Sequence, residues 1–265
     1  MRVDRNSIPY TLGFAALVCL VCAVPIALAA VGLKPLQVQN QLVDRRSKVL
    51  AVAGLLGPDE RPSASEIEER FTANVIPRAV ELRTGELTDS VDASSYDQRR
   101  ASGDAAQSEP APPNPARVQR VPHVGIVYHV MKDGAVQTLV IPIQGYGLWS
   151  TMYGFLALEA DGVTVSGITF YEHGETPGLG GEVENPRWQA LWKGRKALDD
   201  EGRVKLRVIK GNAGTPSADP YRVDGISGAT ITTQGVTNTL HFWLGPSGFG
   251  PYLAKYRKSQ GGTPR

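Results

Sequence analysis

An uncharged, mostly apolar stretch from Thr11 to Gly32 sets the first condition on how this 265-residue chain can fold. An α-helix needs roughly 20 such residues to cross the hydrocarbon core of a bilayer. The stretch continues past Ala27-Leu28-Ala29, which resembles a signal-peptidase site, and it is longer than the usual apolar part of a signal peptide. We therefore predict an uncleaved, single transmembrane anchor over 11–32, preceded by a short N-terminal segment over 1–10.

The charges that flank the predicted anchor leave its orientation open. Arg2 and Arg5 precede it, and the basic residues that follow it are Lys34, Arg45, Arg46 and Lys48. The positive-inside rule gives no clear answer when both flanks are basic.

Both cysteines, Cys19 and Cys22, lie within the predicted anchor. The rest of the chain can therefore form no disulfide, cysteine-ligated zinc site or cysteine-ligated iron–sulfur cluster of its own. Residues three apart share a helix face, so a metal or a partner thiol could bridge the pair. Their interpretation as small apolar lining residues is simpler, and we predict no metal site.

The net charge of +2 gives no electrostatic reason to expect nucleic acid as a partner. The basic residues are scattered along the chain, and none of the familiar nucleic-acid modules shows its pattern. We therefore predict no nucleic-acid binding.

After the anchor we predict a juxtamembrane helical region over 33–85. Apolar residues recur at helical spacing in its first part, and Ser65 and Glu68 have the spacing of a capping box that opens a second helix. This second helix is expected to end before Pro77. The segment 86–121 is rich in Ser, Ala, Asp, Arg and Pro, which is typical of a linker or a long surface loop.

Residues 122–257 are predicted to form a compact α+β domain with a mainly antiparallel sheet and flanking helices, followed by a tail over 258–265. Asp133-Gly134 joins two strand-like runs and is a strong hairpin signal. The strand-like runs, rich in β-branched and aromatic residues, are Val124–Val130, Val136–Ile143, Val163–Tyr171 and Val204–Ile209.

The run Asp224-Gly-Ile-Ser-Gly-Ala-Thr230 is a candidate attachment site for a flavin held through its phosphate by a threonine hydroxyl. Gly228 permits a tight turn and close approach, while Ser227 and Ala229 leave space around Thr230. A helical pattern follows, so a phosphate on Thr230 would lie at a helix N-terminus. A plain polar turn with an N-cap is the alternative. A serine nucleophile elbow is rejected, because glycine does not stand two residues after Ser227.

A second, glycine-rich run from His173 to Gly181 follows an apolar strand. Such a loop exposes backbone N–H groups and lets a flat ring approach, although it can also be an ordinary turn. A zinc deaminase would need a downstream cysteine pair, and a P-loop would end in Lys-Ser/Thr. In Gly145–Ser150, Tyr146 and Trp149 are candidates either to flank a flavin ring or to fill the core.

Taken together, these runs strongly resemble the covalent FMN-binding subunit of the bacterial sodium-translocating NADH:quinone reductases. The resemblance extends from the anchor to about Arg257. The matching runs are Gly147-Leu-Trp-Ser-Thr-Met-Tyr-Gly154, Phe170-Tyr-Glu-His-Gly-Glu-Thr-Pro-Gly-Leu-Gly-Gly-Glu182, Val223-Asp-Gly-Ile-Ser-Gly-Ala-Thr-Ile-Thr232, Asn185–Trp192, Phe242–Gly245 and Leu50–Leu55.

The resemblance implies that Thr230 carries FMN as a phosphoester, installed by a separate flavin transferase that uses FAD. It implies no catalytic residue beyond the flavin itself. The other residues that we expect near the cofactor are Ser227, Gly228, Ala229, Asp224, Glu175, Thr176, Gly178, Leu179, Gly180 and Trp149.

The resemblance also places the chain in the bacterial inner membrane, with residues 1–10 in the cytoplasm and the FMN domain in the periplasm. Its expected partners are the other membrane and soluble members of an assembly of six subunits. Our hypothesis is that the chain relays electrons while other subunits oxidise NADH and reduce quinone. Sodium is not expected to cross this subunit alone, because 11–32 contains no charged residue.

Three other functions compete with this one. The FMN subunit of an Rnf-type electron-transport complex is the nearest, and the long N-terminal helical region and the Leu50–Leu55 run argue against it. A membrane-anchored, flavin-binding sensory module is the second. An exported hydrolase is the most distant, because no convincing nucleophile and base pair is present.

Overall fold

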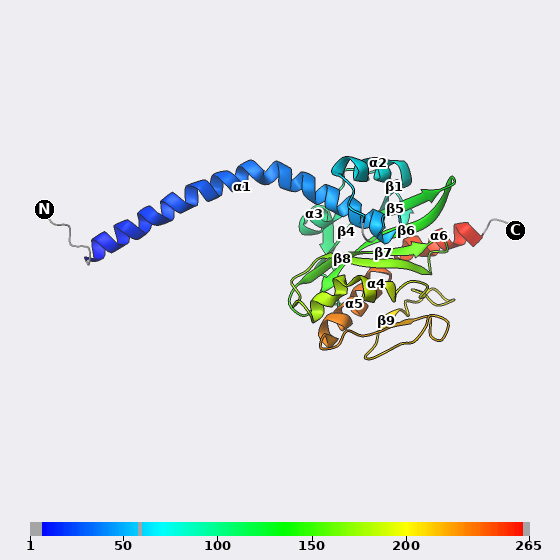
Figure 1. The fold of residues 1–265 in the computed structure, drawn as a ribbon. Helices are drawn as coiled ribbons and strands as arrows, with labels where there is room; N and C mark the ends of the chain where they lie inside the picture. Colours follow the sequence, from blue (N-terminus) through cyan, green and yellow to red (C-terminus); the bar gives the residue numbers. More distant parts are fainter. Residues whose placement is uncertain (1–6, 58–59, 262–265) are drawn as a thin grey trace. The chain divides into compact units, whose positions relative to one another are not determined.

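The computed structural model describes residues 7–57 and 60–261, and the chain divides into two units, residues 1–45 and 46–265. Helix α1 runs without a break from Ile8 to Val52 (Figure 1). In the described part of the chain it is the helix that is long and apolar enough to cross a membrane. The predicted anchor lies within it, and Pro25 and Pro35 are accommodated without ending the helix. Gly54, at φ 76°, follows its end.

The centre of the second unit is a six-stranded antiparallel sheet with the order β2-β1-β5-β6-β7-β8. Its strands are β1 (Val75–Glu81), β2 (Glu86–Leu87), β5 (Val124–Lys132), β6 (Ala135–Tyr146), β7 (Thr151–Glu159) and β8 (Val165–Glu172). The α+β class and the antiparallel sheet are therefore as predicted.

The predicted hairpin is confirmed between β5 and β6. Asp133 has φ 51° and Gly134 has φ 79°, and two consecutive residues with positive φ characterise the tight turn that joins twisted antiparallel strands. Asparagine, aspartate and glycine adopt this backbone most readily, so the dipeptide fixes the turn locally.

The remaining elements lie outside this sheet. They are α2 (Ala64–Asn74), α3 (Gln98–Gly103), β3 (Ser108–Pro110), β4 (Arg120–Pro122), the 3-10 helix η1 (Gly180–Glu184), α4 (Pro186–Ala190), β9 (Arg207–Val208), β10 (Arg222–Val223), α5 (Thr230–Trp243) and α6 (Gly250–Gly261).

Several local expectations differ from the structure. The capping box of α2 uses Ser63 and Glu66, two residues before the expected pair, because the same spacing occurs twice in this stretch. β1 lies in the region expected to be helical, and β7 was not expected. The run Val204–Ile209 contributes only the two residues of β9. The expected linker over 86–121 instead forms four short elements and buries Ala101 and Ala116.

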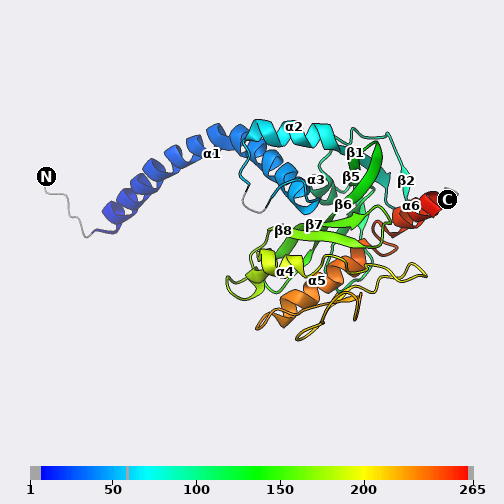
Figure 2. The same ribbon diagram turned by 45° about the vertical axis from the view of Figure 1, so that its right-hand side comes forward.

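Helix α5 lies along one face of the sheet (Figure 2) and packs mainly on β6. Its buried Val236 and Leu240 join the core, and the Trp243 indole N–H donates to the Gln144 carbonyl at 2.7 Å. Gly235 lies so close to the Tyr146 carbonyl that a Cβ would collide with it. This packing brings the N-terminus of α5 to the loop that follows β6.

Candidate functional site

Thr230 is the first residue of α5 and is exposed to solvent. The N-cap residue, Ala229, makes no side-chain hydrogen bond to the first turn. The N–H groups at a helix start have no partner within the helix, and they favour an anion together with the helix dipole. Thr230 therefore presents a reachable hydroxyl at a helix end with no side-chain cap.

The residues before Thr230 are held in place by hydrogen bonds within the protein. The Asp224 carboxylate accepts the Ala213 N–H at 2.8 Å, and its carbonyl accepts the Trp188 indole N–H at 2.9 Å. Gly228 adopts φ 74°, which glycine tolerates best. Asp224, predicted to lie near the cofactor, thus anchors the attachment run to a neighbouring loop. Ser227 and Gly228 are exposed, and Ala229 is buried.

Glu175 connects three segments that are far apart in the sequence. Its carboxylate accepts N–H groups from Leu148 at 3.1 Å, Trp149 at 2.9 Å and Ser150 at 3.3 Å, and the Thr232 hydroxyl donates to it at 2.5 Å. Glu175 is only 5% exposed. The loop 147–150, the loop around Glu175 and the start of α5 are therefore tied together by one side chain.

Burial raises the pKa of Glu175, but the hydrogen bonds from Thr232 and from the backbone N–H groups of Trp149, Leu148 and Ser150 lower it by more. The net result is a pKa below the ordinary value. Within the described residues no lysine or arginine forms an ion pair with Glu175. The site therefore contains a buried carboxylate, ionised at neutral pH, that is stabilised by N–H and O–H donors.

Two glycines make this arrangement sterically possible. A Cβ on Gly180 would lie 2.5 Å from the Thr232 Oγ1 and 2.8 Å from the Glu175 Oε2. A Cβ on Gly147 would lie 2.6 Å from the Glu175 Oε1. Gly180 thus makes room for the Glu175 carboxylate, while Gly178, at φ 74° and exposed, shapes the turn before it.

Apolar side chains are exposed around Thr230. Leu179 approaches Gly228, because a Cβ there would lie 2.8 Å from the Leu179 Cδ2. Trp149 is 65% exposed, so it does not fill the core, which was one of its two expected roles. The other members of this group, 40–58% exposed, are Leu148, Leu179 and Ile231. These side chains provide an apolar surface that a flat ring can cover.

Thr176 takes part in the site through its backbone. Its carbonyl accepts the N–H groups of Leu179 at 3.1 Å and Gly181 at 2.9 Å, and its side chain is exposed. Thr176 therefore closes the turn that carries Leu179.

Sequence reasoning missed several residues that build the site. Thr232 lies in the polar run after Thr230, but no pattern connects it with Glu175, 57 residues earlier. The Ser150 Oγ accepts the Gly174 N–H at 2.6 Å, and the His173 Nδ1 accepts the Glu175 N–H at 3.1 Å. The His173 Nε2 lies 3.1 Å from a Glu184 carboxylate oxygen. These contacts hold the loop 147–150 and the loop around Glu175 in place.

Comparison with known proteins decides the family. A family model described as an FMN-binding domain matches residues 147–245. The NqrC subunit of the Na(+)-translocating NADH-quinone reductase of Pseudomonas aeruginosa is 45% identical over 260 residues, covering 97% of this chain and 99% of the relative. The corresponding Yersinia pestis protein is 45% identical over 258 residues, covering 96% and 95%. This chain belongs to the NqrC family of Na(+)-translocating NADH-quinone reductase subunits.

Solved structures of the NqrC family agree with the fold. NqrC of Shewanella oneidensis superposes with a TM-score of 0.75 at 32% identity, covering 83% of this chain and 99% of that structure. The family member from Parabacteroides distasonis gives a TM-score of 0.63 at 29% identity, covering 83% and 96%.

As a member of the NqrC family, the chain is a component of an oxidoreductase complex, and other subunits of that reductase are its partners. Its FMN-binding domain contains Trp149, Glu175, Leu179 and Thr230. The site also fits this cofactor physically: a helix start without a side-chain cap suits its phosphate, and the exposed apolar side chains suit its ring. The long apolar helix α1 fits a membrane anchor.

Proposed function

We propose that Thr230 carries FMN through a phosphoester and that this subunit relays electrons through that FMN within the reductase. The observation that carries the proposal is the position of Thr230: an exposed hydroxyl on the first residue of α5, next to a helix start that no side chain caps. The match of residues 147–245 to an FMN-binding domain supports it.

The residues around Thr230 have distinct parts in holding the group. The N–H groups at the start of α5 stabilise the phosphate, and Leu179 and Trp149 provide apolar surface for the ring. Glu175 keeps the loops that carry these two side chains in register with α5. FMN, when bound, supplies a centre that accepts and donates electrons.

The attachment reaction needs FAD and a separate flavin transferase. The Thr230 oxygen forms a bond to the phosphorus on the FMN side of FAD. The anhydride bond to the AMP portion breaks, and AMP leaves. The hydroxyl proton is released, so atoms and charge balance without any oxidation or reduction. Exposure of Thr230 is consistent with access by such an enzyme.

At the level of the complex, we place NADH oxidation and quinone reduction on other members of a six-subunit assembly that exports sodium. Helix α1 would anchor the chain in the bacterial inner membrane as a single span, with the FMN domain in the periplasm. A covalent tether suits that side of the membrane, where a lost flavin is not readily replaced. The absence of charge between Thr11 and Gly32 argues for a sodium path in other subunits.

The test is intact mass spectrometry of the chain expressed with and without a flavin transferase. We expect a gain equal to one FMN less one water only with the transferase, mapped to the peptide that contains Thr230. Thr230→Val should abolish the gain, whereas Ser227→Ala, which removes a neighbouring exposed hydroxyl, should keep it. A mass gain that persists in Thr230→Val would place the attachment elsewhere.

Electron relay is tested in the complete reductase. With Thr230→Val, we expect NADH oxidation by an artificial electron acceptor to persist while NADH-driven quinone reduction is lost. Unchanged quinone reduction by a complex free of this FMN would show that electrons bypass the subunit.

A further inference from the structure

A pocket lies beside the loop 147–150. Its volume is about 670 Å³, and its lining includes three arginines, Arg99, Arg117 and Arg120. The aromatic rings of Tyr146 and Tyr153 and the amide of Gln144 also line it, and none of the lining residues described is an aspartate or glutamate. The arginines come from α3, from the loop after Asn114 and from β4, so the fold rather than a run of sequence gathers them.

Arg117 is held in an unusual backbone conformation. Its φ is 53°, in the left-handed region that non-glycine residues rarely adopt. The Asn114 side chain accepts the Val118 N–H at 3.0 Å, and the Ala116 carbonyl accepts the Tyr146 N–H at 2.8 Å. Strained backbone that is fixed from both sides is found preferentially at functional positions. Here it places the Arg117 guanidinium over the Tyr146 ring, 5.0 Å from its centre.

The positive charge of the pocket is only partly balanced. Arg99 forms two hydrogen bonds to Glu172, at 2.6 and 2.8 Å, and lies 3.7 Å from the centre of the Tyr153 ring. Arg120 donates to the Ser108 hydroxyl and carbonyl, and Asp104 is close enough to interact with it. Within the described residues, Arg117 forms no ion pair. Arg117 is therefore, among the described residues, an exposed cation of the pocket without a carboxylate partner.

The pocket is connected to the loop 147–150 by Tyr146. Its ring faces Arg117, and its hydroxyl donates to the Trp149 carbonyl at 2.8 Å. An anionic group bound at Arg117 would therefore lie one side chain away from the exposed Trp149.

We propose that this arginine pocket docks an acidic segment of another subunit of the reductase beside the loop 147–150. A guanidinium fork matches a carboxylate, and a cleft lined by one sign of charge attracts the opposite sign. Membership of a complex with several subunits supplies such partners, and the adjoining loop carries the exposed Trp149 of the candidate site. The docking surface goes beyond the proposed electron relay and does not require the ester on Thr230.

The test uses the complete reductase with Arg117→Glu in this chain. Lys132→Glu is the matched control, because Lys132 is an exposed cation at the other end of the hairpin that leads to Tyr146. We expect Arg117→Glu to lower NADH-driven quinone reduction at low KCl by about tenfold or more, the lower bound for electrostatic steering. The KCl dependence of that activity should become shallower. Lys132→Glu should leave both unchanged.

A second variant separates loss of charge from loss of fold. Asparagine tolerates positive φ, so Arg117→Asn should preserve the loop and still reduce activity. Equal activity of the wild type, Arg117→Asn and Lys132→Glu would overturn the proposal. So would a loss of flavin content in the Arg117 variants, measured by intact mass, because it would assign the pocket to recognition of the phosphates of FAD during maturation.

Discussion

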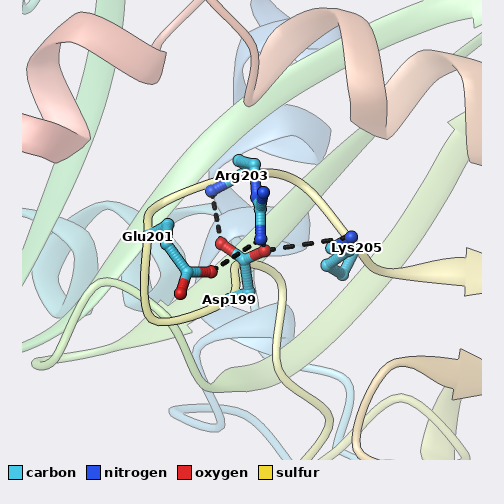
Figure 3. Close-up of polar contacts among 4 residues, drawn as sticks. All are labelled: Asp199, Glu201, Arg203 and Lys205. Atoms are coloured by element: carbon cyan, nitrogen blue, oxygen red, sulfur yellow. Dashed lines mark hydrogen bonds and ion pairs between the residues drawn. The ribbon is translucent and has the colours of Figure 1, made fainter.

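Two loops of the FMN-binding domain are each organised around one carboxylate, but in opposite ways. Glu175 and Asp199 are similarly buried, at 5% and 8% exposure. The Asp199 carboxylate accepts the backbone N–H and the side-chain Nε–H of Arg203, both at 2.8 Å, and the Lys205 Nζ lies 3.9 Å from it (Figure 3). All its partners lie within six residues. The partners of the Glu175 carboxylate are 25 to 57 residues away and carry no formal charge.

Asp199 therefore stabilises a local turn, whereas Glu175 joins segments that are far apart in the sequence. Removing Asp199 loosens one turn, in which Arg203 and Lys205 neutralise the charge. Removing Glu175 deletes the side chain that joins two loops and a helix through its hydrogen bonds. Glu175 also leaves a negative charge at the site, because its donors are dipoles and not cations. The order of the candidate site therefore depends on long-range contacts.

The largest effect should come from deleting the Glu175 carboxylate. Glu175→Ala leaves three backbone N–H groups and the Thr232 hydroxyl without their acceptor, so we expect the free energy of unfolding to fall by at least about 3 kcal/mol. Urea denaturation of the full chain in detergent, followed by tryptophan fluorescence, measures it. Asp199→Ala should cost clearly less, and equal losses would remove the distinction between the two loops.

A smaller effect is expected from removing one donor. Thr232→Val keeps the side-chain shape but deletes the hydroxyl that donates to the ionised Glu175, which should cost about 2 kcal/mol. Thr239→Val is the matched control, because Thr239 is equally buried on α5 but donates to the Gly235 carbonyl at 2.8 Å. Its loss should be about 1 kcal/mol or less. If Thr239→Val proved the more harmful, Glu175 would not depend on this donor.

The smallest effects are those of pH and salt. The pKa of Glu175 is lowered from an ordinary value of 4.5 and that of Asp199 from 3.8; burial raises both, but hydrogen bonds, and for Asp199 also Arg203 and Lys205, outweigh it. A lowered pKa stabilises the fold above the ordinary value, and this contribution is lost as pH falls through the lowered one. The stability difference between wild type and Glu175→Gln, measured by urea denaturation at a series of pH values, should therefore shrink below about pH 4.5.

Added KCl should distinguish the two carboxylates at neutral pH. Screening weakens the attraction of Asp199 to its cations, so the difference between wild type and Asp199→Asn should shrink with salt. The Glu175→Gln difference should be nearly constant, because short hydrogen bonds to buried N–H groups are little screened. The same denaturation series at low and high KCl checks this, and equal salt sensitivity would contradict it.

The sequence predicted the features that depend on local chemistry. The hairpin follows from Asp133-Gly134, the long apolar helix from 11–32, and the helix that begins at Thr230 from the pattern after the small residues 224–229. Flavin attachment at that run stays a prediction. β1 was missed because Pro77 suggests a helix stop, although it lies in a part of the strand that pairs with β5 alone, since β2 pairs only with Val80 and Glu81. β7 was missed because most of its residues are apolar and buried in succession. Its sequence therefore lacks the alternation of apolar and polar residues that indicates a strand.

The candidate site was predicted in its parts but not in its connections. Glu175 and Trp149 were expected near the cofactor. No periodicity in the sequence, however, indicates that the Glu175 carboxylate accepts the Trp149 N–H and the Thr232 hydroxyl. Such contacts exist only after the sheet order has brought β6, β8 and α5 together. The arginine pocket was missed for the same reason, since its three arginines lie in a segment expected to be a linker and meet residues of β6 and β7 only in the fold.

Ala229 has a consequence for maturation. A side-chain cap at a helix start is typically worth about 1 kcal/mol, and alanine at this position supplies none of it. A phosphate esterified to Thr230 would cap the helix in place of an amino-acid side chain. Installing the pigment would then also complete a secondary-structure element, and the mature protein should melt at a slightly higher temperature than its colourless precursor.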